Sequence, residues 1–354
     1  MIQPGRRSLT IDGRSLGPEE PCYIVAEISG NHNQNFERAL AIVKAAKDAG
    51  ADAVKLQTYT PDTITLDCVG DEFQIHGTAW NGRRLHELYQ EAQTPWDWHL
   101  RLKTAANELG LALFSSPFDL TAVDFLEKMG MPAYKIASCE LVDLPLIRRA
   151  AKTGKPLILS TGMATLGEIE EAVSTARAAG KGSIALLKCT CAYPAPIGEM
   201  NLRTIAHLAQ TFGVPVGLSD HSLGTEAPVA AVALGATIVE KHLTLSRSDA
   251  GPDSAFSLEP AEFKAMVAAV RSAEQALGRI EYGPTSTELA STRYRRSLFV
   301  VEDMRAGEAF DSANVRSIRP ATGLHTRHLE AVLGRHARID IKHGTPLRWD
   351  LVSE

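Results

Sequence analysis

The chain has 354 residues, of which 44% are hydrophobic and 22% are charged. This composition is typical of a folded globular protein and excludes a largely disordered chain. The formal net charge of −5 argues against a basic nucleic-acid-binding surface, and no apolar run approaches the length of a membrane-spanning helix.

Short apolar runs alternate with amphipathic stretches from the start of the chain. The pattern predicts strands at 22–29, 53–59, 111–116, 133–138, 156–161, 184–190, 215–221 and 237–244. Helical periodicity predicts helices at 36–47, 97–109, 119–129, 144–153, 166–179, 200–212, 226–234 and 260–277.

Strands that are apolar throughout are typical of a parallel sheet covered by helices. Eight strand–helix units over residues 20–280 therefore predict an α/β fold, a (β/α)8 TIM barrel. An open doubly wound sheet is the alternative, but residues 27–32 after the first strand contain no GxGxxG loop.

Two segments do not fit the simple repeat. Residues 60–95 are too long for an ordinary loop and carry Phe73, Trp80 and Tyr89. In a barrel they would lie on the active-site face, where long loops select the substrate, and these aromatic side chains would contribute to that choice. A surface excursion without contact to the substrate is the alternative. After a barrel domain at 1–283 we expect a linker at 284–292 and a small β-rich domain at 293–354, with strand-like runs at 297–301 and 337–341.

The cysteines and the N-terminus indicate the compartment. The five cysteines are scattered without a CxxC pair, which fits reduced thiols better than a disulfide framework. Residues 1–7 contain no apolar segment of a secretory signal. We therefore expect a cytoplasmic protein.

Polar residues gather where the predicted strands end, which is where barrel enzymes build their active sites. Lys55 and Lys135, with hydroxyl groups from three serines, form a plausible phosphate or carboxylate pocket. The three serines are Ser138, Ser160 and Ser219. Ion pairs that only stabilise the barrel mouth are the alternative explanation.

His221 and His242 end consecutive strands, so their rings can converge on one divalent ion and leave positions open for water or substrate. Asp220 and Glu240 beside them could orient the two rings. Ordinary hydrogen-bonded histidines remain the alternative. A zinc site at Cys189 and Cys191 is disfavoured, because a CxC on a strand is more often two small buried side chains.

Several motifs in chain order resemble the sialic acid synthase family, and the tail is similar to that family's antifreeze-protein-like (SAF) domain. They are 23–33 (YIVAEISGNHN), 52–57 (DAVKLQ), 135–138 (KIAS), 217–221 (GLSDH) and 240–242 (EKH). Further segments resemble the pseudaminic acid synthase branch, namely 57–62 (QTYTPD), 77–80 (GTAW), 88–89 (LY), 94–96 (TPW), 114–119 (FSSPFD) and 251–256 (GPDSAF).

The resemblance implies condensation of phosphoenolpyruvate (PEP) with an open-chain acylamino sugar, giving a nine-carbon 2-keto acid and phosphate. It implies that PEP is held by Lys55, Lys135, Ser138, Ser160, Ser219 and Asp253. It further implies that His221 and His242 bind Mn²⁺ or Mg²⁺ and that Glu140 is the catalytic base. In the pseudaminic acid synthase branch the sugar is 2,4-diacetamido-2,4,6-trideoxy-β-L-altropyranose.

The same resemblance implies that Glu27, Gln57 and Tyr193 contact the sugar. Arg319 would reach an N-acetyl group in the partner's site of a domain-swapped homodimer. Cys191 departs from the family pattern, since it stands where the family has an Asn that contacts PEP, and a thiol is a poor hydrogen-bonding substitute.

Other functions remain open from the sequence. An N-acetylneuraminate or legionaminate synthase would use the same chemistry on a different sugar. A metal-dependent barrel hydrolase would need more ligands than the single histidine that residues 31–33 supply. A carbohydrate- or ice-binding protein built on the antifreeze-like tail would not need so many ionisable residues at the strand ends.

Overall fold

The computed structural model describes residues 8–353; the segment 1–7, in which no secretory signal was predicted, lies outside the described part. The chain divides into two units, Met1–Gly278 and Arg279–Glu354, and each is described by itself. Within residues 8–353, no helix combines the length and the apolar character that crossing a membrane requires.

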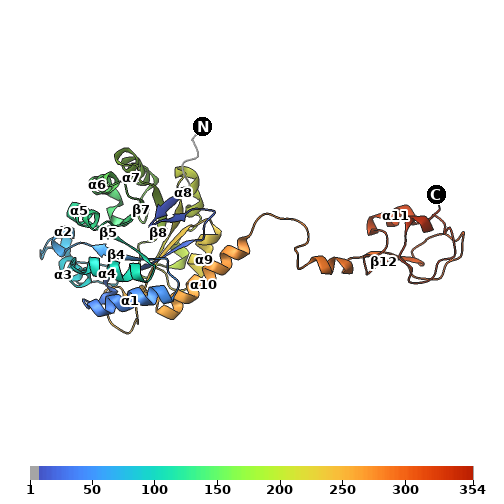
Figure 1. The fold of residues 1–354 in the computed structure, drawn as a ribbon, viewed down its shortest axis with the longest axis horizontal. Coiled ribbons are helices and arrows are strands. Elements are labelled where there is room, and N and C mark those ends of the chain that lie inside the picture. Colours follow the sequence, from blue (N-terminus) through green and yellow to red (C-terminus); the bar gives the residue numbers. More distant parts are fainter. Residues whose placement is uncertain (1–7, 354) are drawn as a thin grey trace. The chain divides into compact units, whose positions relative to one another are not determined.

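Eight parallel strands close into a barrel in the order β10-β3-β4-β5-β6-β7-β8-β9, with helices around it (Figure 1). The strands are β3 (Tyr23–Glu27), β4 (Ala53–Thr58), β5 (Ala112–Pro117), β6 (Tyr134–Ile136), β7 (Leu157–Ser160), β8 (Ile184–Cys189), β9 (Val216–Asp220) and β10 (Ile238–His242). All eight lie within the predicted strands to within a residue, so the TIM-barrel prediction is confirmed.

The surrounding helices also agree with the predicted periodicity. They are α1 (Phe36–Asp48), α4 (Trp98–Glu108), α5 (Leu120–Lys128), α6 (Leu144–Lys152), α7 (Leu166–Ala179), α8 (Thr204–Phe212), α9 (Glu226–Ala233) and α10 (Pro260–Leu277). Side chains fix several starts: Asp119 accepts hydrogen bonds from the first backbone N–H groups of α5, and Thr165 with Glu168 forms a capping box on α7.

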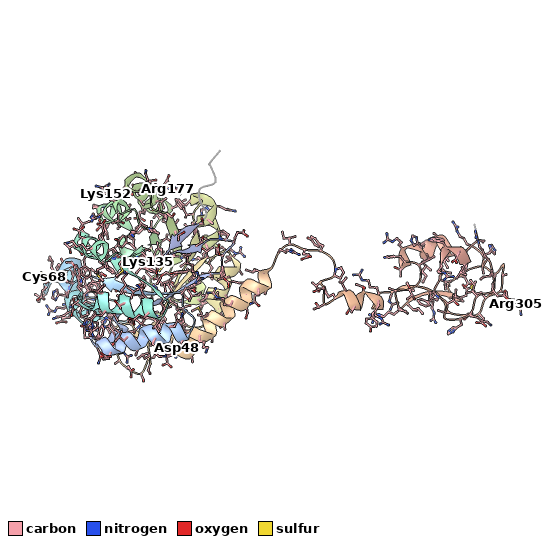
Figure 2. All side chains as sticks on the ribbon, in the orientation of Figure 1. Asp48, Cys68, Lys135, Lys152, Arg177 and Arg305 are labelled. Atoms are coloured by element: carbon pink, nitrogen blue, oxygen red, sulfur yellow. The ribbon has the colours of Figure 1, made fainter. Side chains whose placement is uncertain are left out.

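A hairpin of β1 (Leu9–Ile11) and β2 (Arg14–Leu16) closes the amino-terminal end of the barrel. Leu9, Ile11 and Leu16 are buried in one cluster with interior barrel residues such as Tyr23 and Ile238. Because this end is plugged, polar side chains at the opposite end face the open mouth. Figure 2 places Lys135 within the barrel, whereas Lys152 lies on the outer helix α6.

The segment 60–95 is an ordered insertion rather than a bare loop. It contains the short helix α2 (Pro61–Ile64) and the helix α3 (Leu85–Ala92), neither of which was predicted. Its far end is held against the barrel, because Gln34 Nε2 donates hydrogen bonds to the carbonyl oxygens of Glu91 and Gln93.

The second unit has its own small apolar core. It contains the antiparallel strands β11 (Ser297–Val300) and β12 (Val315–Ile318) and the short helix α11 (Leu329–Val332). The predicted run at 337–341 forms only isolated bridges, Met304 with Ile341 and Ala337 with Val352, instead of a continuous strand.

Candidate active site

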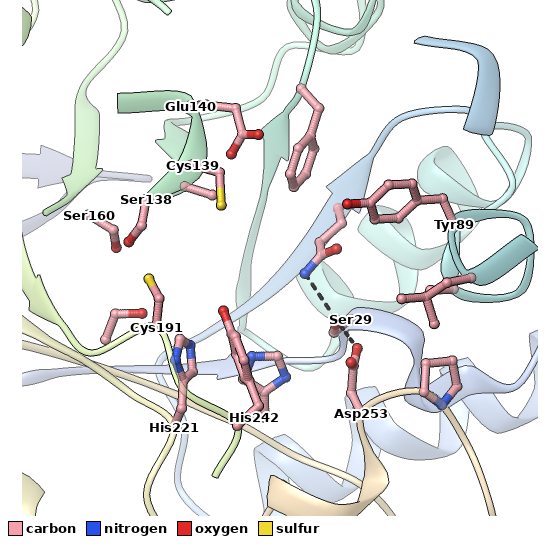
Figure 3. Close-up of a pocket in the computed structure, with 18 of the residues that line it drawn as sticks. Ser29, Tyr89, Ser138, Cys139, Glu140, Ser160, Cys191, His221, His242 and Asp253 are labelled. Carbon is pink, nitrogen blue, oxygen red and sulfur yellow. Dashed lines mark hydrogen bonds between the residues drawn. The ribbon is translucent and has the colours of Figure 1, made fainter. Parts of the chain in front are cut away.

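A cavity of about 450 Å³ lies at the carboxyl ends of the barrel strands, within the first unit. Lys55 on β4, Lys135 on β6 and Glu240 on β10 line its floor. Figure 3 shows Ser138 and Glu140 on one side of the cavity and the two histidines on the other. TIM-barrel enzymes place their catalytic groups at this end.

Two buried lysines and two buried glutamates form one charged cluster on this floor. Lys55 Nζ lies 2.7 Å from Glu27 Oε2 and 3.5 Å from Glu240 Oε1. Lys135 Nζ lies 3.4 Å from the same Glu240 oxygen. One carboxylate oxygen therefore faces both ammonium groups and keeps them close together.

The two lysines differ in how well their charge is supported. Burial alone would lower the pKa of Lys55, but the Glu240 and Glu27 carboxylates outweigh burial and raise it. For Lys135, burial dominates over the attraction of Glu240 and lowers the pKa. Lys135 shares the Glu240 carboxylate with Lys55, so an anionic ligand would add counter-charge beside Lys135, and the floor is suited to bind phosphate or carboxylate.

Three serine hydroxyls surround these lysines. Ser219 Oγ lies 3.3 Å from Glu240 Oε1, and Ser138 Oγ accepts a hydrogen bond of 3.1 Å from the Gly162 backbone N–H. Ser160 Oγ is buried without a hydrogen-bond partner among the described residues. Because buried hydroxyls are normally hydrogen-bonded, the Ser160 hydroxyl is available to a ligand in the cavity.

Asp253 lies apart from the lysines, in a second polar set. Its carboxylate accepts hydrogen bonds from the Ser29 hydroxyl and, at 3.0 Å, from the Gly30 backbone N–H. Gln57 Nε2 in turn donates to Ser29 Oγ at 2.9 Å and to Glu27 Oε1 at 3.2 Å. The structure thus brings Asp253 together with Gln57 and Glu27, two of the expected sugar contacts.

The two histidines converge as their strand positions predict. The ring centroids of His221 and His242 are 5.4 Å apart, and His221 Nδ1 lies 3.1 Å from the carbonyl oxygen of Thr190. His242 Nδ1 is buried without a hydrogen-bond partner among the described residues. Tyr193 packs on His221 and Phe256 on His242, with centroid distances of 4.4 and 5.0 Å.

This pair fits a divalent ion that keeps open coordination positions. In residues 8–353 no group of three or more His, Cys, Asp and Glu side chains is gathered as a closed metal site. Two imidazoles alone would leave the remaining positions to water and substrate oxygens. The uncommitted Nδ1 of His242 agrees with a histidine whose partner is a ligand.

Glu140 lies on the short helical turn Cys139–Val142 and lines the cavity. Burial raises the pKa of its carboxyl to about 7, and its Oε2 atom has no hydrogen-bond partner in the described part of the chain. A carboxylate that titrates near neutral pH is suited to take a proton during the reaction. The position and the pKa both agree with a general base.

Cys191 lines the cavity beside Ser138, at the position where an Asn contact was expected. Its Sγ atom lies 3.8 Å from Cys189 Sγ. A Cβ atom added to Gly162 would overlap the Cys191 sulfur, so the thiol is packed tightly against that glycine. The thiol occupies this place without offering a strong hydrogen-bond donor.

The insertion 60–95 supplies an apolar wall above this polar floor. The wall residues from the insertion are Ile64, Ile75, Trp80, Leu85, Leu88 and Tyr89. Trp80 Nε1 donates a hydrogen bond of 2.7 Å to the Pro252 carbonyl oxygen, and its ring lies 5.3 Å from that of Tyr193. Phe73, which was also expected to contribute, does not line the cavity.

Two groups of the site were not expected in their observed roles. Ser29, which connects Gln57 with Asp253, follows the first strand as other site residues do, and this placement was the available signal. Glu240 was expected to orient the histidines but faces the lysines. Arg319 follows β12 in the second unit and is exposed there.

Comparison with known proteins gives consistent matches over both units. A model of the NeuB family matches residues 42–282, and a SAF domain model matches residues 295–353. The chain is 46% identical over 332 residues to the pseudaminic acid synthase of Helicobacter pylori, covering 94% of this chain and 98% of that protein.

Two more distant relatives place the branch in context. The N,N'-diacetyllegionaminic acid synthase of Campylobacter jejuni is 37% identical over 329 residues, which is 92% of this chain and 98% of that protein. The solved N-acetylneuraminic acid synthetase of Leptospira borgpetersenii, in complex with citrate, has a TM-score of 0.72 and 32% identity, covering 80% of this chain and 94% of that chain.

Proposed function

The chain belongs to the NeuB family, and we propose that it is an enzyme that condenses PEP with 2,4-diacetamido-2,4,6-trideoxy-β-L-altropyranose. The products would be pseudaminic acid and phosphate. Identity to the pseudaminic acid synthase of H. pylori is 46%, against 37% to the legionaminic acid synthase of C. jejuni, which favours this sugar.

The polar floor would hold PEP. Its phosphate and carboxylate need several cationic and hydroxyl donors, and Lys55 and Lys135 lie on the floor with Ser138, Ser160 and Ser219 around them. The 3.5 and 3.4 Å separations of the two lysines from Glu240 support a shared anion site, since a bound phosphate could replace one carboxylate as their partner. Asp253 was assigned to PEP from the family resemblance, but its hydrogen bonds favour a place between the two substrates.

The two histidines would hold a divalent ion, Mn²⁺ or Mg²⁺. When bound, such an ion acts as a Lewis acid on the sugar aldehyde and lowers the pKa of water. His221 and His242 would hold the ion next to the polar floor. The packing of Tyr193 and Phe256 on their rings supports a fixed geometry.

Glu140 would act as the base. Carbon 3 of PEP forms the new bond to the aldehyde carbon, water adds to carbon 2, and phosphate departs with cleavage of its carbon–oxygen bond. The Glu140 carboxylate would accept the proton that this water loses. Its pKa of about 7 supports the role, because the raised pKa makes the carboxylate a stronger base while a good part of it is still deprotonated at neutral pH.

The sugar would lie between this floor and the apolar wall. Glu27, Gln57 and Tyr193 would contact its polar groups, and Trp80 with its neighbours would face its acetamido and methyl groups. Arg319 of a second subunit would complete the site in a domain-swapped homodimer. We further infer a cytoplasmic location, which the five free cysteines support.

The proposal rests on one observation: two buried lysines and an apolar wall line the same cavity. The test incubates the full chain with PEP and a panel of 2-acetamido and 2,4-diacetamido sugars, measuring phosphate release and product mass. We expect a pseudaminic acid product that disappears on chelation and returns with Mn²⁺ or Mg²⁺. A legionaminic or N-acetylneuraminic acid product would overturn the branch, and no sugar-dependent phosphate release would overturn the synthase.

A further inference from the structure

The strands that lead to His221 and His242 are joined by a buried side-chain contact in addition to their backbone pairing. Strands β9 and β10 run side by side, and their register pairs Asp220 with Lys241, each one residue before a histidine. Consecutive strand residues point to opposite faces. Accordingly His221 and His242 line the cavity, whereas Asp220 and Lys241 do not.

Asp220 and Lys241 form an ion pair behind the strands. Lys241 Nζ contacts Asp220 Oδ2 and donates a hydrogen bond of 2.6 Å to the Ser222 carbonyl oxygen. Asp220 Oδ1 accepts hydrogen bonds from the backbone N–H and the hydroxyl of Ser222, at 2.8 and 2.7 Å. Both charged side chains have 0% exposure, so every contact is removed from water.

A stabilising role alone does not explain this pair well. Taking two charges out of water costs about as much as their attraction returns, so a fully buried ion pair gives little net stability. What it does give is a fixed geometry, because separating the partners would leave an unpaired buried charge. Because Asp220 and Lys241 both hydrogen-bond Ser222, the ion pair also fixes the backbone directly after His221.

We propose that Asp220 and Lys241 are positioning residues that hold His221 and His242 at the spacing a divalent ion requires. The inference rests on the proposed metal site and adds the groups that set its geometry. Removing a group that orients metal ligands commonly weakens metal binding about 10- to 100-fold.

The test measures Mn²⁺ binding to the full chain directly, from the electron paramagnetic resonance signal of free Mn²⁺, without any sugar. Lys241→Met keeps the side-chain length and leaves Asp220 with its two Ser222 donors. We expect about 10- to 100-fold weaker Mn²⁺ binding, approaching the loss in His221→Ala. Lys342→Met, which breaks the exposed pair of Lys342 with Asp303 in the second unit, is the matched control and should bind as the parent does.

PEP binding to the metal-free protein, measured by calorimetry, distinguishes positioning of the two histidines from a purely structural role of the ion pair. Positioning predicts that Lys241→Met loses Mn²⁺ affinity while PEP affinity stays within twofold. Parallel loss of both, or unchanged Mn²⁺ affinity in a folded variant, would overturn the inference. If Lys241→Met fails to fold, the same two binding measurements are made on Asp220→Asn. A parent protein that binds no Mn²⁺ at all would instead show that the proposed metal site is wrong.

Discussion

Glu27 and Lys55 lie opposite each other on the neighbouring strands β3 and β4, and 2.7 Å separates Glu27 Oε2 from Lys55 Nζ. Both side chains are buried at the mouth of the barrel. Since Gln57 Nε2 also donates to Glu27, this carboxylate joins the lysine floor to the set that includes Gln57 and Asp253. The lysine floor and this second polar set therefore meet at one ion pair.

The first prediction concerns this lysine. Lys55→Ala should raise KM for PEP roughly 10- to 100-fold, because it removes one charge-assisted contact worth about 1.5–3 kcal/mol. KM for the sugar should change less. Steady-state kinetics with each substrate varied in turn measures both values, and Lys342→Ala, on an exposed ion pair, is the control. Equal effects on the two substrates would contradict the assignment of the floor to PEP.

Most of the fold could be predicted because each barrel strand is a short, mainly apolar run that is followed by an amphipathic helix. The hairpin of β1 and β2 was missed, since three-residue strands carry little periodicity. Its turn did carry a signal: Asp12 and Gly13 both have positive φ, 48° and 80°, and Asp-Gly is a favoured two-residue hairpin turn. Helix α3 was missed because the long insertion was treated as one loop.

The site residues could be predicted at the level of strand ends, but their pairing could not. The strand positions of Lys55 and Lys135 place both in the mouth, whereas their common contact with Glu240 depends on the register and curvature of the closed barrel. Asp253 lies in a loop after β10, and only the folded path of that loop brings it to Ser29 and Gly30.

The second prediction concerns the base. Glu140→Gln should lower kcat by about 10²- to 10⁴-fold, the usual range for a positioned proton acceptor. In the parent enzyme kcat should rise with pH through about 7, because burial raises the pKa of Glu140 to about 7 and only the carboxylate accepts a proton. This limb of the pH profile should be absent in the variant. Glu199→Gln, at an exposed position outside the cavity, should leave the profile intact.

The third prediction concerns stability in acid. Burial lowers the pKa of His99 to about 4, and its Nε2 lies 2.7 Å from the Thr58 hydroxyl. The unfolded chain, with a pKa near 6.5, binds the proton first, so stability is complete above about pH 6.5 and falls as the pH approaches 4. At about 1.4 kcal/mol per pKa unit, the full loss is about 3 kcal/mol.

Urea unfolding of the parent and of His99→Asn at pH 7 and pH 4.5 measures this effect. The variant should have a smaller difference in unfolding free energy between the two pH values, even if it is less stable at both. His207→Asn, at an exposed histidine, serves as the control. An identical pH dependence in parent and His99→Asn would show that the pKa of His99 does not differ between the folded and unfolded states. Burial also lowers the pKa of His32 to about 4, so part of the acid sensitivity should persist in the variant.

The last prediction concerns the apolar wall and the choice of sugar. The 2,4-diacetamido-2,4,6-trideoxy sugar has a methyl group where N-acetylmannosamine has a hydroxyl, and it carries a second acetamido group. Trp80 presents an aromatic face that packs near Tyr193 and Phe256, with centroid distances of 5.3 and 6.1 Å. An apolar pocket rejects an added hydroxyl only about a hundredfold, so the parent enzyme should prefer the trideoxy sugar but still accept some N-acetylmannosamine.

Trp80→Ala should reduce this preference, because it removes the aromatic face without touching the PEP floor. Direct competition between the two sugars, read by product mass, gives the ratio of their kcat/KM values. Phe73→Ala is the matched control, since Phe73 belongs to the same insertion but does not line the cavity. If N-acetylmannosamine is the better substrate of the parent enzyme, the sugar assignment is wrong while the PEP floor stands. If Trp80→Ala and Phe73→Ala change the ratio equally, the preference arises elsewhere in the insertion.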